Sequence, residues 1–421
     1  RSARRDPGLL RSGRPLAAPL SVSGLSPRPR ALLARAAKRA GRPVLSAPAG
    51  PLGGYPAQEL RPGASVNAAL ASGDLGLGAV GTVTYRDGDT VFAFGHPLDA
   101  AGPRSLFLQD AYVFGVIANP LTIPDLGIGS YKLAAASGHT LGTLTNDALS
   151  AVVGKLGSPP PSIALHAAAH ERGGGRQAFV DTDLADERGL DLGAGLSLIA
   201  PLALGQTIDE VVRSAEPATF TTCVRFRATQ LRPFGYCNVY FDSLVALSDL
   251  EQASGLVESY NLSPLSLTSV SVSTQLRRGV RSAELLSARA PRRARPGRRA
   301  RVVLTLGYPH RGRKRLTVRV PVPLGISSGR HVLVLQGSAD SASSSLEDIT
   351  SELGAILLGD GGAESPPPPR SRAALVRRVR ALHHPEGILA HFDRRKARLV
   401  RASALTQFTG RVRVPVRVSR R

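Results

Sequence analysis

The stretch GTVTYRDGDTVFAFGHPL, residues 81–98, carries the strongest structural signal in this chain. Two runs in which apolar and polar residues alternate, 83–85 and 91–94, flank Asp87-Gly88-Asp89. Alternation with a period of two on both sides of an Asp-Gly pair predicts a β-hairpin. The hairpin ends in Gly95-His96-Pro97, so the sequence predicts a histidine where a strand stops.

Both neighbours of His96 restrict the backbone. Gly95 has no Cβ, which allows other backbone to come close. Pro97 fixes its own φ and favours an extended backbone at His96. We therefore expect a rigid mount that holds one imidazole at a strand end and faces it into a cleft. The alternative is a structural histidine whose ring hydrogen-bonds a neighbouring carbonyl. Carboxylates near enough in sequence to orient the ring are Asp87, Asp89, Asp99 and Asp110.

This hairpin resembles the SpoIVB peptidase family, the stage IV sporulation protein B serine peptidases. Gly81-Thr82 and Gly95-His96 stand where that family has a glycine-threonine strand start and a Gly-His pair. A second block agrees in order and spacing, with YKL at 131–133, LGTL at 141–144 and GKLG at 154–157. The resemblance covers residues 16–245. It implies the peptidase fold, a protein or peptide substrate, and His96 as the catalytic general base.

The nucleophile is harder to assign. In the family it lies in a Gly-x-Ser-Gly-Ser-Pro segment downstream of the histidine, and no such segment follows His96. An activated serine needs a neighbouring base and backbone donors for the oxyanion, which a glycine-rich turn commonly supplies. The weak candidates are Ser130, Ser137 and Ser158, and of these we take Ser137 as the nucleophile candidate.

The pattern along the chain predicts a mainly β protein of three parts. Residues 1–255 form a β-barrel-like peptidase-type domain, with strands at 79–94, 112–117, 162–168 and 178–183 and helices at 27–40, 207–215 and 243–254. Residues 262–338 form an immunoglobulin-like β-sandwich, with strands at 270–276, 300–306, 316–322 and 331–335. Residues 339–421 form a small α/β region, with helices at 341–358 and 375–382 and a strand at 411–418.

Charge is unevenly distributed along the 421 residues. The net charge is +23, and three flanking segments, 1–42, 277–330 and 366–421, carry +10, +15 and +13, so the remainder is acidic. The basic segments lack interleaved aromatic residues, so we expect no nucleic-acid partner. A solvated surface is one interpretation of the arginines. The other is binding to an anionic cell-surface polymer or lipid.

Cys223 and Cys237 are the two cysteines, and each lies in a strand-like run beside a Pro-Phe-Gly turn. Adjacent antiparallel strands bring two Cα atoms within disulfide reach, so we predict a disulfide between them. A disulfide favours an extracytoplasmic or secreted protein of a bacterium. Since residue 1 is Arg rather than Met, we expect a fragment, or a processed chain that has lost its signal peptide.

Metal and cofactor sites have little support. His166 and His170 lie in a predicted strand, about 13 Å apart at ~3.3 Å per residue, which is too far for one ion. His383, His384, Glu386 and His391 have no characteristic ligand spacing. We expect no metal and no cofactor.

Two functions remain open. The first is a serine endopeptidase in which His96 takes the proton of a serine. The second is a non-catalytic extracytoplasmic binding or scaffold protein built on the same fold. A hydroxyl within hydrogen-bond reach of His96 would favour the first.

Overall fold

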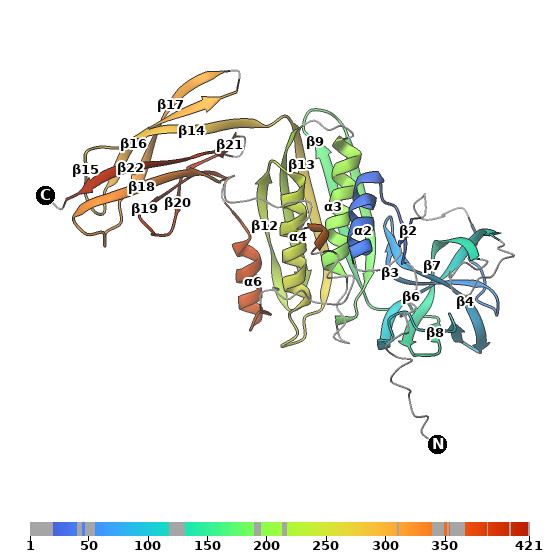
Figure 1. Ribbon diagram of the computed structural model, residues 1–421. Coiled ribbons are helices and arrows are strands. Elements are labelled where there is room, and N and C mark those ends of the chain that lie inside the picture. The colour runs from blue at the N-terminus through green and yellow to red at the C-terminus, as the bar shows by residue number, and fades with distance from the viewer. Residues whose placement is uncertain are drawn as a thin grey trace, which may run out of the picture.

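A computed structural model describes residues 20–39, 44–46, 55–117, 131–188, 195–212, 217–309, 311–338, 349–351, 353, 367–384, 386–403 and 406–419. The protein is mainly β, as predicted, and its elements form three bodies: a barrel, a sheet covered by helices, and a β-sandwich (Figure 1). Where they are contrasted with the sandwich, the barrel and the helix-covered sheet are together called the first body. No helix in these ranges has the length and apolar character needed to cross a bilayer.

The barrel is built from six strands. They are β3 (Ser65–Gly73), β4 (Gly76–Asp87), β5 (Thr90–Ala93), β6 (Gly102–Ile117), β7 (Tyr131–Asp147) and β8 (Val152–Leu156). Their order is β3-β6-β7-β8-β5-β4, and β4 pairs again with β3, so the sheet closes on itself. Inward-facing Val83, Val91, Leu108 and Leu144 are buried in its core. This closure confirms the predicted barrel, and the β4–β5 hairpin turns at Gly88, where φ is +55°.

A five-stranded sheet extends from the barrel. It contains β9 (Ser162–Glu171), β10 (Gln177–Ala185), β11 (Ala218–Ala228), β12 (Leu231–Tyr240) and β13 (Leu267–Arg278), in the order β12-β11-β13-β9-β10. Strand β10 pairs with β3 of the barrel, so both bodies share one hydrogen-bonded sheet. Short strands β1 (Leu20–Ser23) and β2 (Val44–Ser46) extend the other edge beyond β4.

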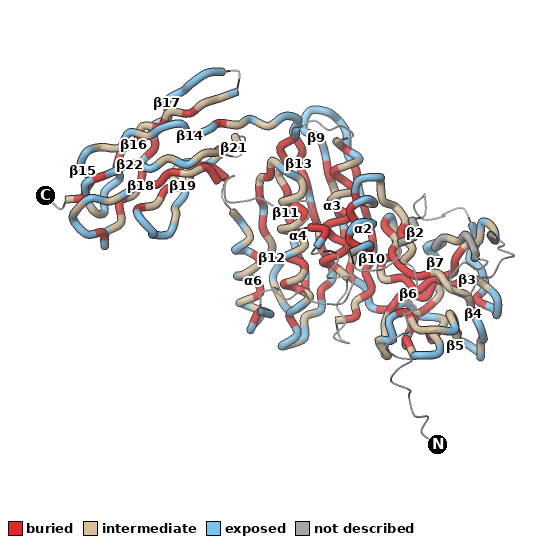
Figure 2. The backbone as a smooth tube through the Cα atoms, viewed as in Figure 1, coloured by how far each residue is buried: buried red, intermediate tan, exposed pale blue. Residues whose placement is uncertain are grey.

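In the described part of the chain, helices cover one face of the five-stranded sheet (Figure 1). They are α2 (Pro27–Arg39), α3 (Leu196–Val212), α4 (Ser243–Glu258) and α6 (Arg372–Ala381). Buried residues concentrate where helices meet the sheet (Figure 2). The residues of β9 and β10 alternate between buried and more exposed, because only one face of the sheet is covered.

Helix α3 begins earlier than the sequence predicted. The sequence predicted a helix that starts at Thr207, but Thr207 lies inside the helix and its hydroxyl donates to the carbonyl of Leu204. The helix starts at Leu196, where the Glu258 carboxylate accepts hydrogen bonds from the Leu196 and Ser197 N–H groups. A carboxylate distant in sequence caps this helix, which a local pattern does not reveal.

The C-terminal body is a sandwich of two sheets around one apolar core. One sheet has the order β17-β16-β14-β21, and the other has the order β15-β22-β18-β19-β20. The first contains β14 (Arg281–Arg289), β16 (Arg299–Tyr308), β17 (Gly312–Pro321) and β21 (Thr406–Thr409). The second contains β15 (Arg293–Ala294), β18 (Gly329–Gly337), β19 (Gly387–Phe392), β20 (Arg398–Ala402) and β22 (Arg411–Val418).

The boundaries differ from those predicted. Strand β13, expected to open the second domain, pairs with β9 and β11 of the first. Helix α6 packs with the first domain through Leu375 and Val379, whereas β19–β22 complete the sandwich. Alternation shows that a strand is half buried but not which sheet it joins, so these pairings lay beyond the sequence. Of the helix predicted at 341–358, only residues 349–351 and 353 are described, and they are helical.

The predicted disulfide is confirmed. Cys223 of β11 and Cys237 of β12 lie directly opposite each other, with their Cα atoms 4.0 Å apart. Their neighbours Thr222 and Asn238 are buried under the helices, so the disulfide lies on the uncovered face, and Cys237 is exposed. The bond favours an oxidising environment.

Replacing both cysteines, as C223S/C237S, should lower the free energy of unfolding by about 2–4 kcal/mol, because the bond closes a short loop in the unfolded chain. Urea unfolding followed by circular dichroism measures this difference. Because the bond is exposed, dithiothreitol without denaturant should produce the same loss in the wild-type protein. No loss in either experiment would contradict this expectation.

Candidate functional site

His96 lies in the loop between β5 and β6, three residues after β5 ends. The backbone reverses there through Phe94 and Gly95, whose φ values are +72° and +73°. Gly95 is therefore needed for its positive φ. The predicted close approach at Gly95 was wrong, because a Cβ there would meet nothing within 4 Å.

Close approach occurs at Gly81 instead. A Cβ on this glycine would come within 2.7 Å of the Phe94 ring. The Phe94 ring lies edge-on to the His96 ring, with centroids 5.9 Å apart. The glycine of β4 thus makes room for the aromatic ring that supports the histidine.

The partly buried His96 ring contacts its own chain. Its Nδ1 lies 2.8 Å from the Pro97 carbonyl oxygen, an acceptor, so Nδ1 carries the proton and Nε2 carries the lone pair. Among the described residues, no hydroxyl forms a hydrogen bond with this ring. A hydrogen bond to a neighbouring carbonyl is what we expected if His96 had a structural rather than a catalytic role.

The predicted partner residues lie elsewhere. Asp110 accepts from the Gln58 N–H and lies 3.3 Å from His139 Nδ1, while Asp99 pairs with Arg104. Asp87 and Asp89 flank the β4–β5 turn. Ser130 lies outside the described residues, Ser137 belongs to β7 with no side-chain placement described, and Ser158 is exposed with its carbonyl bound to the Thr143 hydroxyl.

Sequence reasoning missed Asp147, which organises the loop after His96. Its fully buried carboxylate accepts hydrogen bonds from the N–H groups of Leu98 (2.7 Å), Asp99 (2.8 Å) and Ala101 (3.3 Å). Arg104 lies 4.0 Å from the same carboxylate and binds Glu187 through two nitrogens. Burial alone would lower the pKa of Arg104, but the hydrogen bond and charge of Glu187 outweigh it and raise that pKa. Three backbone donors of the loop that follows His96 are thus occupied by a carboxylate of the same chain.

D147A should lower the free energy of unfolding by about 3 kcal/mol, because it leaves three backbone donors and a nearby buried guanidinium without this carboxylate. Urea unfolding measures the effect. D99A is the matched control, since Asp99 pairs with the same arginine but is much more exposed; it should change stability by less than about 1 kcal/mol. Equal losses in the two variants would contradict the role given to Asp147.

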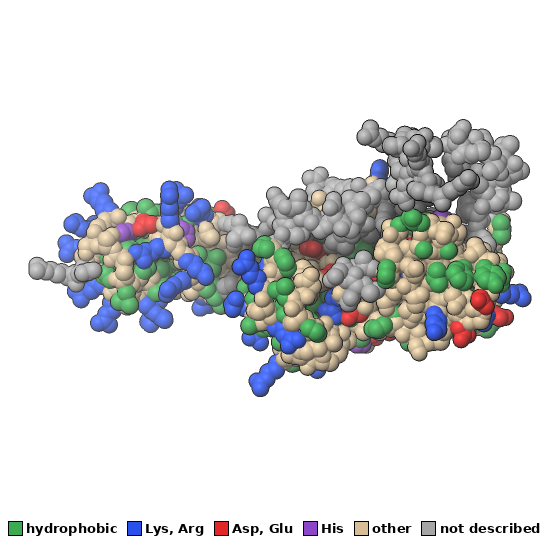
Figure 3. All heavy atoms as spheres, turned by 90° about the horizontal axis from the view of Figure 1, so that it is seen from below, with side chains coloured by type: hydrophobic (Ala, Val, Ile, Leu, Met, Phe, Trp, Pro, Cys, Tyr) green, Lys and Arg blue, Asp and Glu red, His purple; other side chains and the backbone are tan. Residues whose placement is uncertain are grey.

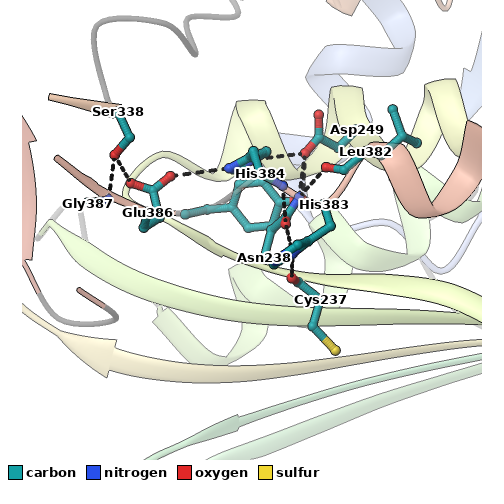
Figure 4. Close-up of polar contacts among 10 residues, drawn as sticks. Cys237, Asn238, Asp249, Ser338, Leu382, His383, His384, Glu386 and Gly387 are labelled. Atoms are coloured by element: carbon teal, nitrogen blue, oxygen red, sulfur yellow. Dashed lines mark hydrogen bonds and ion pairs between the residues drawn. The ribbon is translucent and has the colours of Figure 1, made fainter. Parts of the chain in front are cut away.

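A second polar cluster joins the first body to the sandwich (Figure 4). His384 Nε2 lies 3.2 Å from Asp249 of α4, and its Nδ1 lies 3.3 Å from Glu386. Asp249 also accepts from the Tyr240 hydroxyl and from Asn238. On the other side, Ser338 donates to Glu386 and accepts from the Gly387 N–H at the start of β19. One imidazole therefore connects carboxylates that belong to the two bodies.

In this cluster the positively charged His384 ring has a structural role, because it lies between two carboxylates. Burial alone would lower the pKa of His384, but hydrogen bonds to Asp249 and Glu386 and their charges raise it to about 9. Burial, followed by the charges of neighbouring groups, raises the pKa of Tyr240. Both ring nitrogens of His384 face carboxylates, so the ring has no lone pair for a metal. No metal-binding group of three or more residues occurs in the described ranges.

A Ser-His-Asp constellation also occurs in the sandwich. His331 Nδ1 lies 2.7 Å from Asp393, and Nε2 lies 3.5 Å from the Ser327 hydroxyl. However, Nε2 is closer, at 2.8 Å, to the carbonyl oxygen of Ser327. An acceptor faces each nitrogen, so the ring is held between the Asp393 carboxylate and the Ser327 carbonyl and is not aligned on the Ser327 hydroxyl. A hydrogen bond from the Val332 N–H, followed by contact with His331, lowers the pKa of Asp393.

A cavity of about 490 Å³ lies elsewhere, between α2, α3, β11 and α4. Its charged groups already have partners, since Arg28 binds Asp209 at 3.2 Å and Asp242 caps α4. None of the residues predicted for the site line it. A cavity of about 40 Å³ beside His384 is too small for a substrate.

Comparisons of this chain with known protein families, with curated proteins and with solved protein structures found no match. The assignment of a function therefore depends on the residues themselves.

Substituting His384 should destabilise the protein only where its ring is charged. Because the pKa is raised in the folded state, the stabilisation is complete below the ordinary value near 6.5 and disappears as the pH rises through about 9. H384Q should cost roughly 1–3 kcal/mol at pH 6 and almost nothing at pH 10. Urea unfolding across this range measures the difference. H383Q is the control, because His383 Nδ1 donates to the Cys237 carbonyl and His383 forms no ion pair with a carboxylate among the described residues. Identical pH profiles would contradict the assignment.

Proposed function

We propose that this chain is a non-catalytic, extracytoplasmic binding or scaffold protein built on the fold of the SpoIVB peptidase family. In this proposal His96 descends from the general base of that family. The first two bodies correspond to the peptidase-type domain, and the C-terminal body to an immunoglobulin-like sandwich. The disulfide supports an oxidising environment outside the cytoplasm.

The observation that carries the proposal is that the backbone N–H groups of the loop after His96 are already bound by the Asp147 carboxylate. In a serine peptidase, backbone N–H groups near the nucleophile stabilise the negative oxygen that forms in the transition state. Here the three donors beside His96 point at Asp147, whose negative charge would repel a second anion. The absence of a hydroxyl partner for His96 among the described residues supports the same conclusion.

The second candidate is a SpoIVB-type serine endopeptidase acting on a protein or peptide. One observation favours it: the Pro97 carbonyl fixes the proton on Nδ1, which leaves Nε2 with the lone pair that a general base requires. This is the tautomer found in a catalytic triad. A structural histidine uses the same tautomer, so the nucleophile decides between the two functions.

A fluorophosphonate probe, which labels activated serines, distinguishes the two functions. The native wild-type protein should show no more labelling than the heat-denatured protein, whereas a known serine protease in the same reaction is labelled. H96A and S327A should behave as the wild type does. Labelling that H96A abolishes would establish the peptidase and overturn the proposal. Labelling that S327A abolishes would move the activity to the sandwich and overturn it as well.

A further inference from the structure

Three arginines form one transverse row on the sandwich. Arg417 of β22 lies directly opposite Arg293 of β15 on one side and opposite Arg330 of β18 on the other. All three are exposed. Since directly paired residues on neighbouring strands project from the same face, the three guanidinium groups share the outer face of the five-stranded sheet.

This row is unfavourable on its own. Like charges directly opposite each other destabilise a sheet. In the described part of the chain, none of the three arginines forms an ion pair, whereas in the first body Arg86, Arg104 and Arg188 all bind carboxylates. The described sandwich segments, 281–338 and 387–419, contain 22 Lys and Arg residues but only Glu284 and Asp393 as acids. Asp393 is already bound to His331.

The positive charge continues along one strand. On β22, Arg411, Arg413 and Arg417 are exposed, Pro415 occupies the outward position between Arg413 and Arg417, and Val414 and Val416 are buried. Alternate residues of a strand lie about 7 Å apart. The strand therefore presents a line of guanidinium groups that crosses the transverse row at Arg417. We call these five arginines, Arg293, Arg330, Arg411, Arg413 and Arg417, the arginine track.

The opposite face is also basic. On the four-stranded sheet Arg301 of β16 lies directly opposite Arg319 of β17, and both are exposed. Lys and Arg side chains project on several sides of the sandwich (Figure 3). A planar membrane contacts one face at a time, whereas a flexible polymer reaches both. The arrangement therefore fits a polymer better than a bilayer.

We propose that the arginine track binds a flexible, linear polyanion that carries phosphate groups and is not a nucleic acid. The polymer lies along β22 and neutralises the row that lacks acidic partners. This inference deepens the proposed binding role and depends on it. The two can fail separately, because serine labelling tests the first body and polymer binding tests the sandwich.

The experiment uses the full chain and long-chain inorganic polyphosphate as the probe. The row variant is R293Q/R330Q/R417Q. The control is R172Q/R176Q/R227Q, which removes the same charge from exposed arginines of the first body. Binding is measured by fluorescence anisotropy at several salt concentrations. Because each released counterion contributes about 0.7 to the slope of log K against log salt for a single-stranded chain, the row variant should lose about 2 from that slope.

The row variant should bind roughly 10- to 100-fold more weakly near 0.1 M salt, whereas the control should change little. Equal losses of affinity in the two variants would show that only the net charge of the protein matters, and would overturn the proposed binding site on the arginine track. An anionic-lipid vesicle bound as tightly as polyphosphate would assign the surface to a membrane. A single-stranded oligonucleotide bound more tightly than polyphosphate of equal charge would assign it to nucleic acid. Either result would overturn the proposal.

The melting temperature provides a second readout. Without polymer, the row variant should melt at the same temperature as the wild type or higher, because like-charge repulsion is removed. Polyphosphate should raise the melting temperature of the wild type more than that of the row variant. A row variant that is less stable without polymer would show that the arginines stabilise the sheet, and would overturn the inference.

Discussion

The arrangement of the first two bodies depends on one strand, β3, which belongs both to the barrel and to the helix-covered sheet. This strand closes the barrel by pairing with both β4 and β6, and its last residues pair with β10 of the helix-covered sheet. Small side chains make this possible. Ala68, Ala69 and Ala71 are buried, and a Cβ on Gly78 of β4 would come within 2.6 Å of the Ala68 carbonyl oxygen. Because β3 is a strand of both the barrel and the helix-covered sheet, the barrel with the His96 loop and the sheet with the disulfide form one continuous hydrogen-bonded sheet.

Sequence reasoning succeeded where the relevant interactions are local. The β4–β5 hairpin, helix α2, the final strand β22 and the cysteine pair all follow from turn residues, periodicity or spacing. It failed where a partner comes from far along the chain. The Glu258 cap of α3 lies 62 residues from Leu196, and Asp147 lies 49 residues from Leu98. The candidate site was predicted only as far as His96 and its mount, because no local pattern marks the carboxylate that fills the adjacent backbone donors.

The histidines of this protein differ in what faces their nitrogens, and that difference decides their chemistry. His331 and His384 each have an acceptor at both nitrogens, so each ring joins two segments of the chain. His96 has an acceptor at Nδ1, and Nε2 forms no hydrogen bond among the described residues. Proton transfer requires a ring nitrogen that is not already bound to an acceptor, and of these three histidines only His96 offers one. Among the described residues, no hydroxyl forms a hydrogen bond with His96. The proposed function therefore rests on the groups around the histidine, above all Asp147, rather than on the histidine itself.

The sandwich is attached to the first body by more than a linker. The chain enters it after β13, where the Gly279 N–H donates to the Pro217 carbonyl and the Thr219 hydroxyl donates to the Gly279 carbonyl. After β18 the chain returns to the first body, where α6 packs on the helix-covered sheet, and it re-enters the sandwich through His384 and Glu386. A polymer held along β22 would therefore pull on a body anchored at separate crossings, one of them an ion pair. Because Asn238, which binds the Leu382 carbonyl and the His384 N–H at that crossing, directly follows Cys237, the disulfide lies beside the same junction.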